Sequence, residues 1–162
     1  MFIIKKIDRK TIIGVLFTLL LMAGTGVRLF FLSHTPLTAY CEAVGTYYTE
    51  INSTFSFTDF FRQFHIEINE TPIQEINVQI PEIFNTVYEN YNALQKMQGF
   101  DLSSYKGETV KRYTFDVLNR RGTDKVKANI LVLGNRIIAG DLCTYLLDGN
   151  MTALTDNTLI QG

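Results

Sequence analysis

The chain has 162 residues, of which 46% are hydrophobic, and a formal net charge of −1, so it is long enough for one modest domain with an appendage. The charge is unevenly distributed, because residues 33–162 carry 10 Lys and Arg against 15 Asp and Glu, a net charge of −5. This acidic balance argues against a nucleic-acid-binding domain.

Residues 11–32 predict a transmembrane helix. Thirteen of them are Leu, Ile, Val or Phe, and as a helix the segment would run about 33 Å, close to the roughly 30 Å thickness of the hydrocarbon core. Its one charge, Arg28, is near enough to the end of the segment for the guanidinium to reach the interface. Four cations precede the segment, whereas none follows it before Arg62. The positive-inside bias therefore places the N-terminus in the cytoplasm and the rest outside.

These features predict a single-pass protein of the cell membrane. Small residues around Ala23 to Gly26 leave cleavage as a signal peptide open, but the apolar run from Val27 to Leu32 favours an uncleaved anchor. Either outcome exports the domain. The expected segments are a cytoplasmic basic segment (1–10), the anchor (11–32), a polar stalk (33–55), an extracytoplasmic domain (56–154) and a loose tail (155–162).

The domain is expected to begin with a short helix. Ser56 or Thr58 can cap a helix over 59–64. Residues 65–69 and 74–80 then alternate polar and apolar side chains, which predicts two strands. Pro81 ends the second strand and suits the first position of a helix.

An amphipathic helix over 82–97 is the clearest expected element. Its apolar residues recur at helical spacing, which predicts that Phe84, Val87, Tyr91 and Leu94 face the core while Asn92 falls on the opposite side. Gly99 is expected to end this helix, and residues 101–107 to form a single helical turn.

After Gly107 the pattern changes to period two. One strand carries Tyr113, Phe115 and Val117 on one face, and the next carries Val126, Ala128, Ile130 and Val132. Gly134-Asn135 predicts a two-residue hairpin turn, followed by a strand with a bulge at Gly140. The expected fold is α+β: one or two amphipathic helices packed on an antiparallel meander of about four strands, behind the N-terminal transmembrane helix.

The run Tyr91 to Leu102 has the form Tyr-Asn-x-Leu-Gln-x-x-Gln-Gly-x-Asp-Leu, and Tyr105-Lys106-Gly107 follows it. Further on come Lys111 to Thr114, Ala128 to Val132, Ile138 to Asp141 and Leu147 to Gly149. In this order and spacing, these segments resemble a family of small membrane-anchored bacterial proteins that is classed as a domain of unknown function. The resemblance covers residues 56–154 and implies no substrate, cofactor or catalytic residue.

Candidate site residues are few. Asn92 and Gln95 can recognise a ligand, since amides both donate and accept hydrogen bonds. Alternatively, Asn92 and Gln98 fix the following loop to the helix, with Gln98 near the apolar stripe. Arg112, on a basic strand face, can meet an anionic wall polymer or a lipid head group, or form part of a solvated face. Glu89, Asp101 and Asp141 are the carboxylates from which a hydrolase would draw its acid and base. Each also has a structural explanation at a helix surface, a cap or a bulge.

Cys41 and Cys143 are the only cysteines, and outside a membrane they can form a disulfide. No cluster of His and Cys has the spacing of a metal site, so we expect no metal and no cofactor. The leading hypothesis is a non-enzymatic extracytoplasmic binding or interaction module, with Asn92, Gln95, Asp101, Arg112 and Asp141 as candidate binding residues. Its partner would be another envelope protein or a wall polymer, not nucleic acid. The alternatives are a cell-surface hydrolase that uses carboxylates and a membrane-complex subunit recognised through its transmembrane helix.

Overall fold

The computed structural model describes residues 37–144, 151–156 and 158–161. The chain divides into two units, Met1–Thr35 and Pro36–Gly162, and the described residues all belong to the second. The basic segment and the anchor expected at residues 1–32 lie outside the described residues. Within the described ranges, no helix is both long and apolar enough to cross a membrane.

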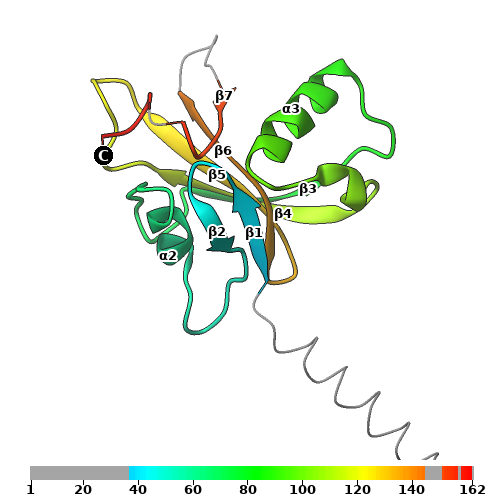
Figure 1. Ribbon diagram of the computed structural model, residues 1–162, viewed down its shortest axis with the longest axis horizontal. Helices are drawn as coiled ribbons and strands as arrows, with labels where there is room; N and C mark the ends of the chain where they lie inside the picture. Colours follow the sequence, from blue (N-terminus) through cyan, green and yellow to red (C-terminus); the bar gives the residue numbers. More distant parts are fainter. Residues whose placement is uncertain (1–36, 145–150, 157, 162) are drawn as a thin grey trace, which may run out of the picture. The chain divides into compact units, whose positions relative to one another are not determined.

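A five-stranded antiparallel meander forms the centre of the second unit (Figure 1). Each strand pairs with the next strand of the sheet along the chain, and α3 lies in the connection between β3 and β4. The α+β class is confirmed, with five strands in the described sheet instead of about four. The strands lie in the order β3 (Gln74–Gln79), β4 (Thr109–Asp116), β5 (Val126–Leu133), β6 (Arg136–Thr144) and β7 (Met151–Thr152).

One face of this sheet carries the main core. The alternation along β5 places Val126, Ala128 and Ile130 in a cluster with Phe60 and Phe61 of α2 (Phe57–Arg62). Ser56 caps α2 in a capping box with Asp59, as the sequence predicts for the position of the cap. The predicted hairpin turn is also present, since Leu133 pairs with Arg136 across a Gly134 at φ 63°.

The expected stalk is wrong for residues 37–55, because they belong to the folded unit. β1 (Thr38–Cys41) and β2 (Gly45–Tyr48) form a hairpin, and the Tyr47 ring, 1% exposed, packs edge-on against Phe64 at 4.9 Å between centroids. A further pairing, Glu50 with Arg136, joins the segment to β6. Packing of Tyr47 and Cys41 in the main core, together with this pairing, holds a segment that shows no apolar period.

The tail and one expected strand also differ from the sequence-based expectation. Ile160 is completely buried and its segment pairs with Arg120, so residues 158–161 are packed and not loose. Residues 65–69 make only an isolated bridge, Ile68 with Val117, although Ile66 and Ile68 are buried as the alternation predicts.

The opposite face of the sheet carries α3 (Thr86–Met97) and the 3₁₀ turn η1 (Leu102–Tyr105). A smaller apolar cluster lies between them and the sheet, and it includes Leu102, Val110 and Leu131. Asn85 caps α3, with its side chain accepting from the Tyr88 amide at 2.9 Å. The helix therefore begins at Thr86 and not at residue 82.

The buried face of α3 is not the one that its apolar residues predict. Val87 is 75% exposed, whereas Asn92 and Gln95 are 2% and 0% exposed. Tyr91 and Leu94 are half-buried at the border of the two faces. The prediction that the apolar face of α3 packs against the core is therefore wrong. The reason is that backbone groups at the edge of β6 need hydrogen-bond partners.

Gln95 and Gln98 supply hydrogen bonds to β6 beyond the point where β7 ends. The Gly140 amide donates to Gln95 Oε1 at 2.9 Å, and Gln98 Nε2 donates to the Gly140 carbonyl at 2.9 Å. Gln98 Oε1 also accepts from the Leu154 amide at 2.7 Å. The two side chains thus satisfy strand-edge groups that would otherwise be buried without partners.

Gly140 is not the site of the bulge that the sequence predicts. The register passes from Leu131 opposite Ala139 to Val132 opposite Ile137, so Ile138 is the extra residue. Glycine is required at position 140 for space, because a Cβ there would lie 2.5 Å from Leu154 Cδ1.

Candidate functional site

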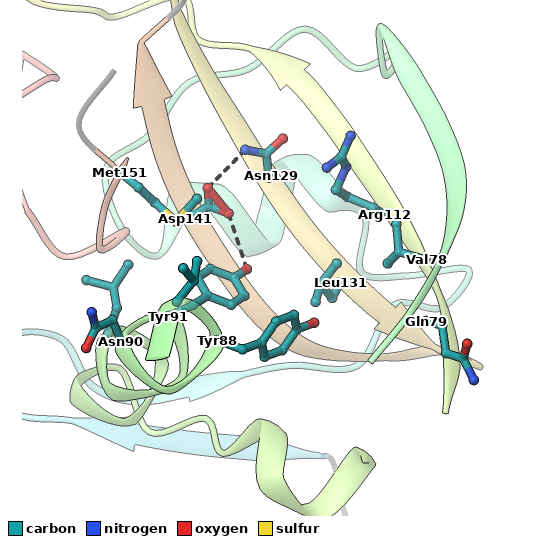
Figure 2. A pocket seen from close by; sticks show the side chains of 12 residues that line it. Val78, Gln79, Tyr88, Asn90, Tyr91, Arg112, Asn129, Leu131, Asp141 and Met151 are labelled. Carbon is teal, nitrogen blue, oxygen red and sulfur yellow. Dashed lines mark hydrogen bonds between the residues drawn. The ribbon is translucent and has the colours of Figure 1, made fainter. Parts of the chain in front are cut away.

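A groove of about 650 Å³ lies between α3 and the sheet, within the range of pockets that hold small molecules. Its wall on the helix side includes the exposed or half-buried face of α3, and its floor includes β4, β5 and β6 (Figure 2). The apolar stripe of α3 therefore lines a cavity, while its Tyr88 and Tyr91 rings also pack against the smaller apolar cluster. The apolar side chains that line it are Val78, Val87, Leu94, Leu131 and Met151, with the rings of Tyr88 and Tyr91.

A buried carboxyl group forms the polar end of this groove. Asp141, 2% exposed, accepts from Asn129 Nδ2 at 3.0 Å through Oδ1 and from the Tyr91 hydroxyl at 3.4 Å through Oδ2 (Figure 2). Asn129 is oriented in turn by the Thr114 hydroxyl, which donates to Asn129 Oδ1 at 2.8 Å. The register explains this row, since Thr114, Asn129 and Asp141 are directly paired across β4, β5 and β6.

Burial raises the pKa of Asp141 to about 6, because the charged form loses its hydration. The hydrogen bonds from Asn129 and Tyr91, and the positive charge of Arg112, oppose that rise. The pKa of Tyr91 is raised well above its ordinary value by burial and by the neighbouring Asp141 charge. The polar end therefore holds a neutral phenol and a carboxyl group that changes charge near neutral pH.

Arg112 lies two register rows away, between Ile76 of β3 and Leu131 of β5. Its side chain is half-buried, and Nη2 donates to Gln74 Oε1 at 3.1 Å. Its Nε is buried and has no hydrogen-bond partner. The groove thus contains a cationic donor group with an unused N–H.

A second, smaller cavity of about 200 Å³ holds Asp101. Asp101 caps η1 by accepting from the Ser103 amide at 2.9 Å, and it also accepts from Asn92 Nδ2 at 3.0 Å. Hydrogen bonds from Ser103 and Asn92 hold the pKa of Asp101 well below its usual range. Asp101 is therefore engaged in fixing the chain after α3.

The structure brings together two of the five candidate binding residues, Arg112 and Asp141. Asn92 is buried and binds the following loop, since its Oδ1 accepts from the Leu102 amide at 2.8 Å. Gln95 is buried against β6, and Asp101 lies in the other cavity.

Sequence reasoning missed Asn129 and the groove position of Tyr91. Asn129 was detectable in one respect, as an uncharged polar residue inside the apolar strand Val126–Leu133. Tyr91 was recognised only as part of an apolar stripe, which gives no sign of the Asp141 contact.

The two cysteines are not bonded to each other, and among the described residues the cysteines and acids are not clustered around a metal site. Cys41 and Cys143 are both free, and the disulfide that the sequence allows is absent because the thiols lie on opposite faces of the sheet. Cys41 belongs to the main core, whereas Cys143 Sγ accepts from Asn129 Nδ2 at 3.4 Å on the groove face. Among the residues that the structure describes, no group of His, Cys, Asp and Glu is arranged to hold a metal ion.

Comparison with known proteins gives a family without an assigned activity. Neither the curated proteins nor the solved structures contain a match to this chain. The family model described as "Domain of unknown function (DUF4830)" matches residues 60–142, from α2 to β6, including Arg112, Asn129 and Asp141. The expected assignment to a domain of unknown function is confirmed, while membrane anchoring stays a prediction. Because the match spans more than half of the sequence, the chain belongs to the DUF4830 family.

Proposed function

We propose that this chain is a membrane-anchored extracytoplasmic binding module, and that the groove between α3 and the sheet takes an apolar small molecule. The observation that carries the proposal is the apolar face of α3, which lines a cavity of about 650 Å³. An apolar cavity with a few converging polar groups is the usual form of a small-molecule site. Asp141, Asn129, Tyr91 and Arg112 are those polar groups.

The anchor and the compartment rest on the sequence. Residues 11–32 have the length and apolar content of a single span, and the cations lie on its N-terminal side. A domain that follows such a span is exported, so the groove would meet molecules of the envelope.

We propose binding in preference to hydrolysis because the described lining of the groove does not contain a pair of carboxylic acids. Among its described lining residues, Asp141 is the one carboxylic acid, and Asp101 belongs to the separate cavity. The paired carboxylates of a glycoside hydrolase flank one bond, at most about 9.5 Å apart. Glu89 is exposed and lines neither cavity.

The two described methionines outside the core give a test in the unaltered, full-length protein. Met151 lines the groove and is 49% exposed, while Met97 is 66% exposed and lies outside it. With ¹³C-methyl-labelled methionine, titration with naphthalene-2-sulfonamide, an uncharged aromatic probe, should shift the Met151 methyl resonance saturably. The Met97 resonance is the internal control, because its exposure is similar. Equal shifts of both resonances, or none, would contradict the proposal.

A further inference from the structure

The hydrogen bonds of the groove leave one buried side-chain atom of its described lining without a partner. Both oxygens of Asp141 accept hydrogen bonds, and Asn129 is bonded through its oxygen and its nitrogen. The Tyr91 hydroxyl donates to Asp141. Arg112 Nε, in contrast, is buried with no acceptor. Among the buried side-chain atoms of the described residues that line the groove, the one without a partner is therefore a donor, and an acceptor oxygen would satisfy it.

The charge of Arg112 determines which acceptor fits best. A guanidinium binds an anionic oxygen more strongly than a neutral one, because both the charge and the N–H geometry match. Arg112 is the one cation among the described residues that line the groove. A ligand head group with a single negative charge would match the single positive charge of Arg112. The apolar walls of the groove would contact the apolar body of the same ligand.

Asp141 opposes such an anion only while it is ionised. The charged or titratable groups around it are Tyr91 from α3, Arg112 from β4 and Cys143 on its own strand. Lys127 and Asp116 are register partners two rows away, and Lys127 is also the register partner of Cys143. Tyr91 and Cys143 both have raised pKa values and stay neutral near pH 7. Asp141 is therefore the group beside Arg112 whose charge changes.

On the basis of the proposed binding function, we propose that the ligand is an apolar molecule with a single anionic oxygen head group. Arg112 holds the head group, and Asp141 takes up a proton when the anion binds. The protonated carboxyl removes the repulsion and gains an O–H that donates to the Tyr91 oxygen or to the ligand. A bound anion also offsets the positive charge of Arg112, which otherwise favours ionised Asp141, so anion and proton bind cooperatively.

The test compares two probes of one shape in the full-length protein, with the Met151 methyl resonance as the readout. Naphthalene-2-sulfonate stays ionised at all working pH values, whereas naphthalene-2-sulfonamide is neutral. At about pH 5 the sulfonate should bind at least about tenfold more tightly than the sulfonamide, as expected for a charge-assisted hydrogen bond. Its affinity should fall as the pH rises through about 6, and that of the sulfonamide should not.

Three variants separate the contributions of the two residues. Arg112→Gln should weaken sulfonate binding more than sulfonamide binding and so remove the preference for the sulfonate. Arg112→Lys keeps the charge but lacks Nε, and should recover only part of the preference. Asp141→Asn imitates the protonated acid, so it should bind the sulfonate at about pH 7.5 as tightly as the parent does at about pH 5. An unchanged Met97 resonance in each variant verifies the fold.

The outcomes distinguish this inference from the proposed function. If the sulfonamide binds in the groove but the sulfonate shows no preference, or a preference independent of Arg112, the anionic head group is refuted and the binding function stands. A sulfonate affinity that keeps its pH dependence in Asp141→Asn refutes proton uptake at that residue. If neither probe shifts the Met151 resonance, both proposals fail.

Discussion

Gln98, the residue that caps the C-terminus of α3, leads to a quantitative prediction about stability. Gln98 is 0% exposed, and its amide binds the Gly140 carbonyl and the Leu154 amide. Gln98→Met keeps the length and helix propensity of the side chain but removes both hydrogen bonds. Each buried backbone group left without a partner costs about 1–3 kcal/mol, so the free energy of unfolding should fall by about 2–6 kcal/mol. That is a large fraction of the stability of a small domain.

The matched control is Lys96→Met on the same helix. The Lys96 side chain is 56% exposed and its ion pair with Asp101 spans 3.6 Å, so its loss should cost less than about 1 kcal/mol. Urea unfolding of the full-length variants, followed by circular dichroism, gives both free energies. If Gln98→Met comes within about 0.5 kcal/mol of Lys96→Met, the strand-edge hydrogen bonds do not stabilise the fold as we argue.

Three further predictions concern strain, pH and thiol access. Gly99→Ala should be more destabilising than Gly122→Ala by about 1–3 kcal/mol in the same urea assay. Both glycines have a positive φ, but of the two only Gly99 lies so close to a backbone atom, the Tyr40 oxygen, that an added Cβ would clash with it. Equal losses of stability in the two variants would refute the close approach. Because folded Asp141, with a pKa near 6, holds its proton more tightly than the unfolded chain, the parent should lose about 3 kcal/mol of stability between about pH 4 and pH 7 that Asp141→Asn does not lose; parallel pH profiles would contradict this. Finally, a maleimide should label half-buried Cys143 in the native protein and buried Cys41 only after unfolding. Mass spectrometry of the labelled peptides measures both reactions. An unlabelled Cys143 in the native protein would indicate a disulfide or a different packing.

β4 and β5 were predictable because one face of each contributes to the main core. Phe115 and Val117 of one strand, and Ala128 and Ile130 of the next, are buried on the face that the period-two pattern indicates. The hairpin turn at Gly134 requires a positive φ, which its sequence signals directly. Local chemistry determines these elements, so the sequence alone suffices.

The orientation of α3 was not predictable from its own residues. Hydrophobic periodicity assigns a helix its buried face by apolar content, but here an unpaired stretch of β6 requires donors and acceptors from the helix. That requirement appears only once the helix is placed against Gly140, 42 residues beyond Gln98. The β1–β2 hairpin was missed for a similar reason, because Tyr47 finds its partners Phe64 and Phe100 far along the chain.

The candidate site was predictable only in part. Arg112 was selected as part of a basic strand face and Asp141 as a carboxylate, and they line one groove. Nothing in the sequence indicates that they share it, because strand register brings them together through Asn129 and Leu131. Tyr91 belongs to the site because the apolar side of α3 faces the cavity.

The amides of Gln95 and Gln98 have a kinetic consequence for anything that enters the groove. They fasten the helix to the strand that carries Asp141, so the distance between wall and floor is set before a ligand arrives. Occupying the groove then demands no closing movement of the helix and little loss of backbone entropy. Association should accordingly proceed in a single step whose rate rises linearly with ligand concentration, without the plateau that a slow rearrangement would impose.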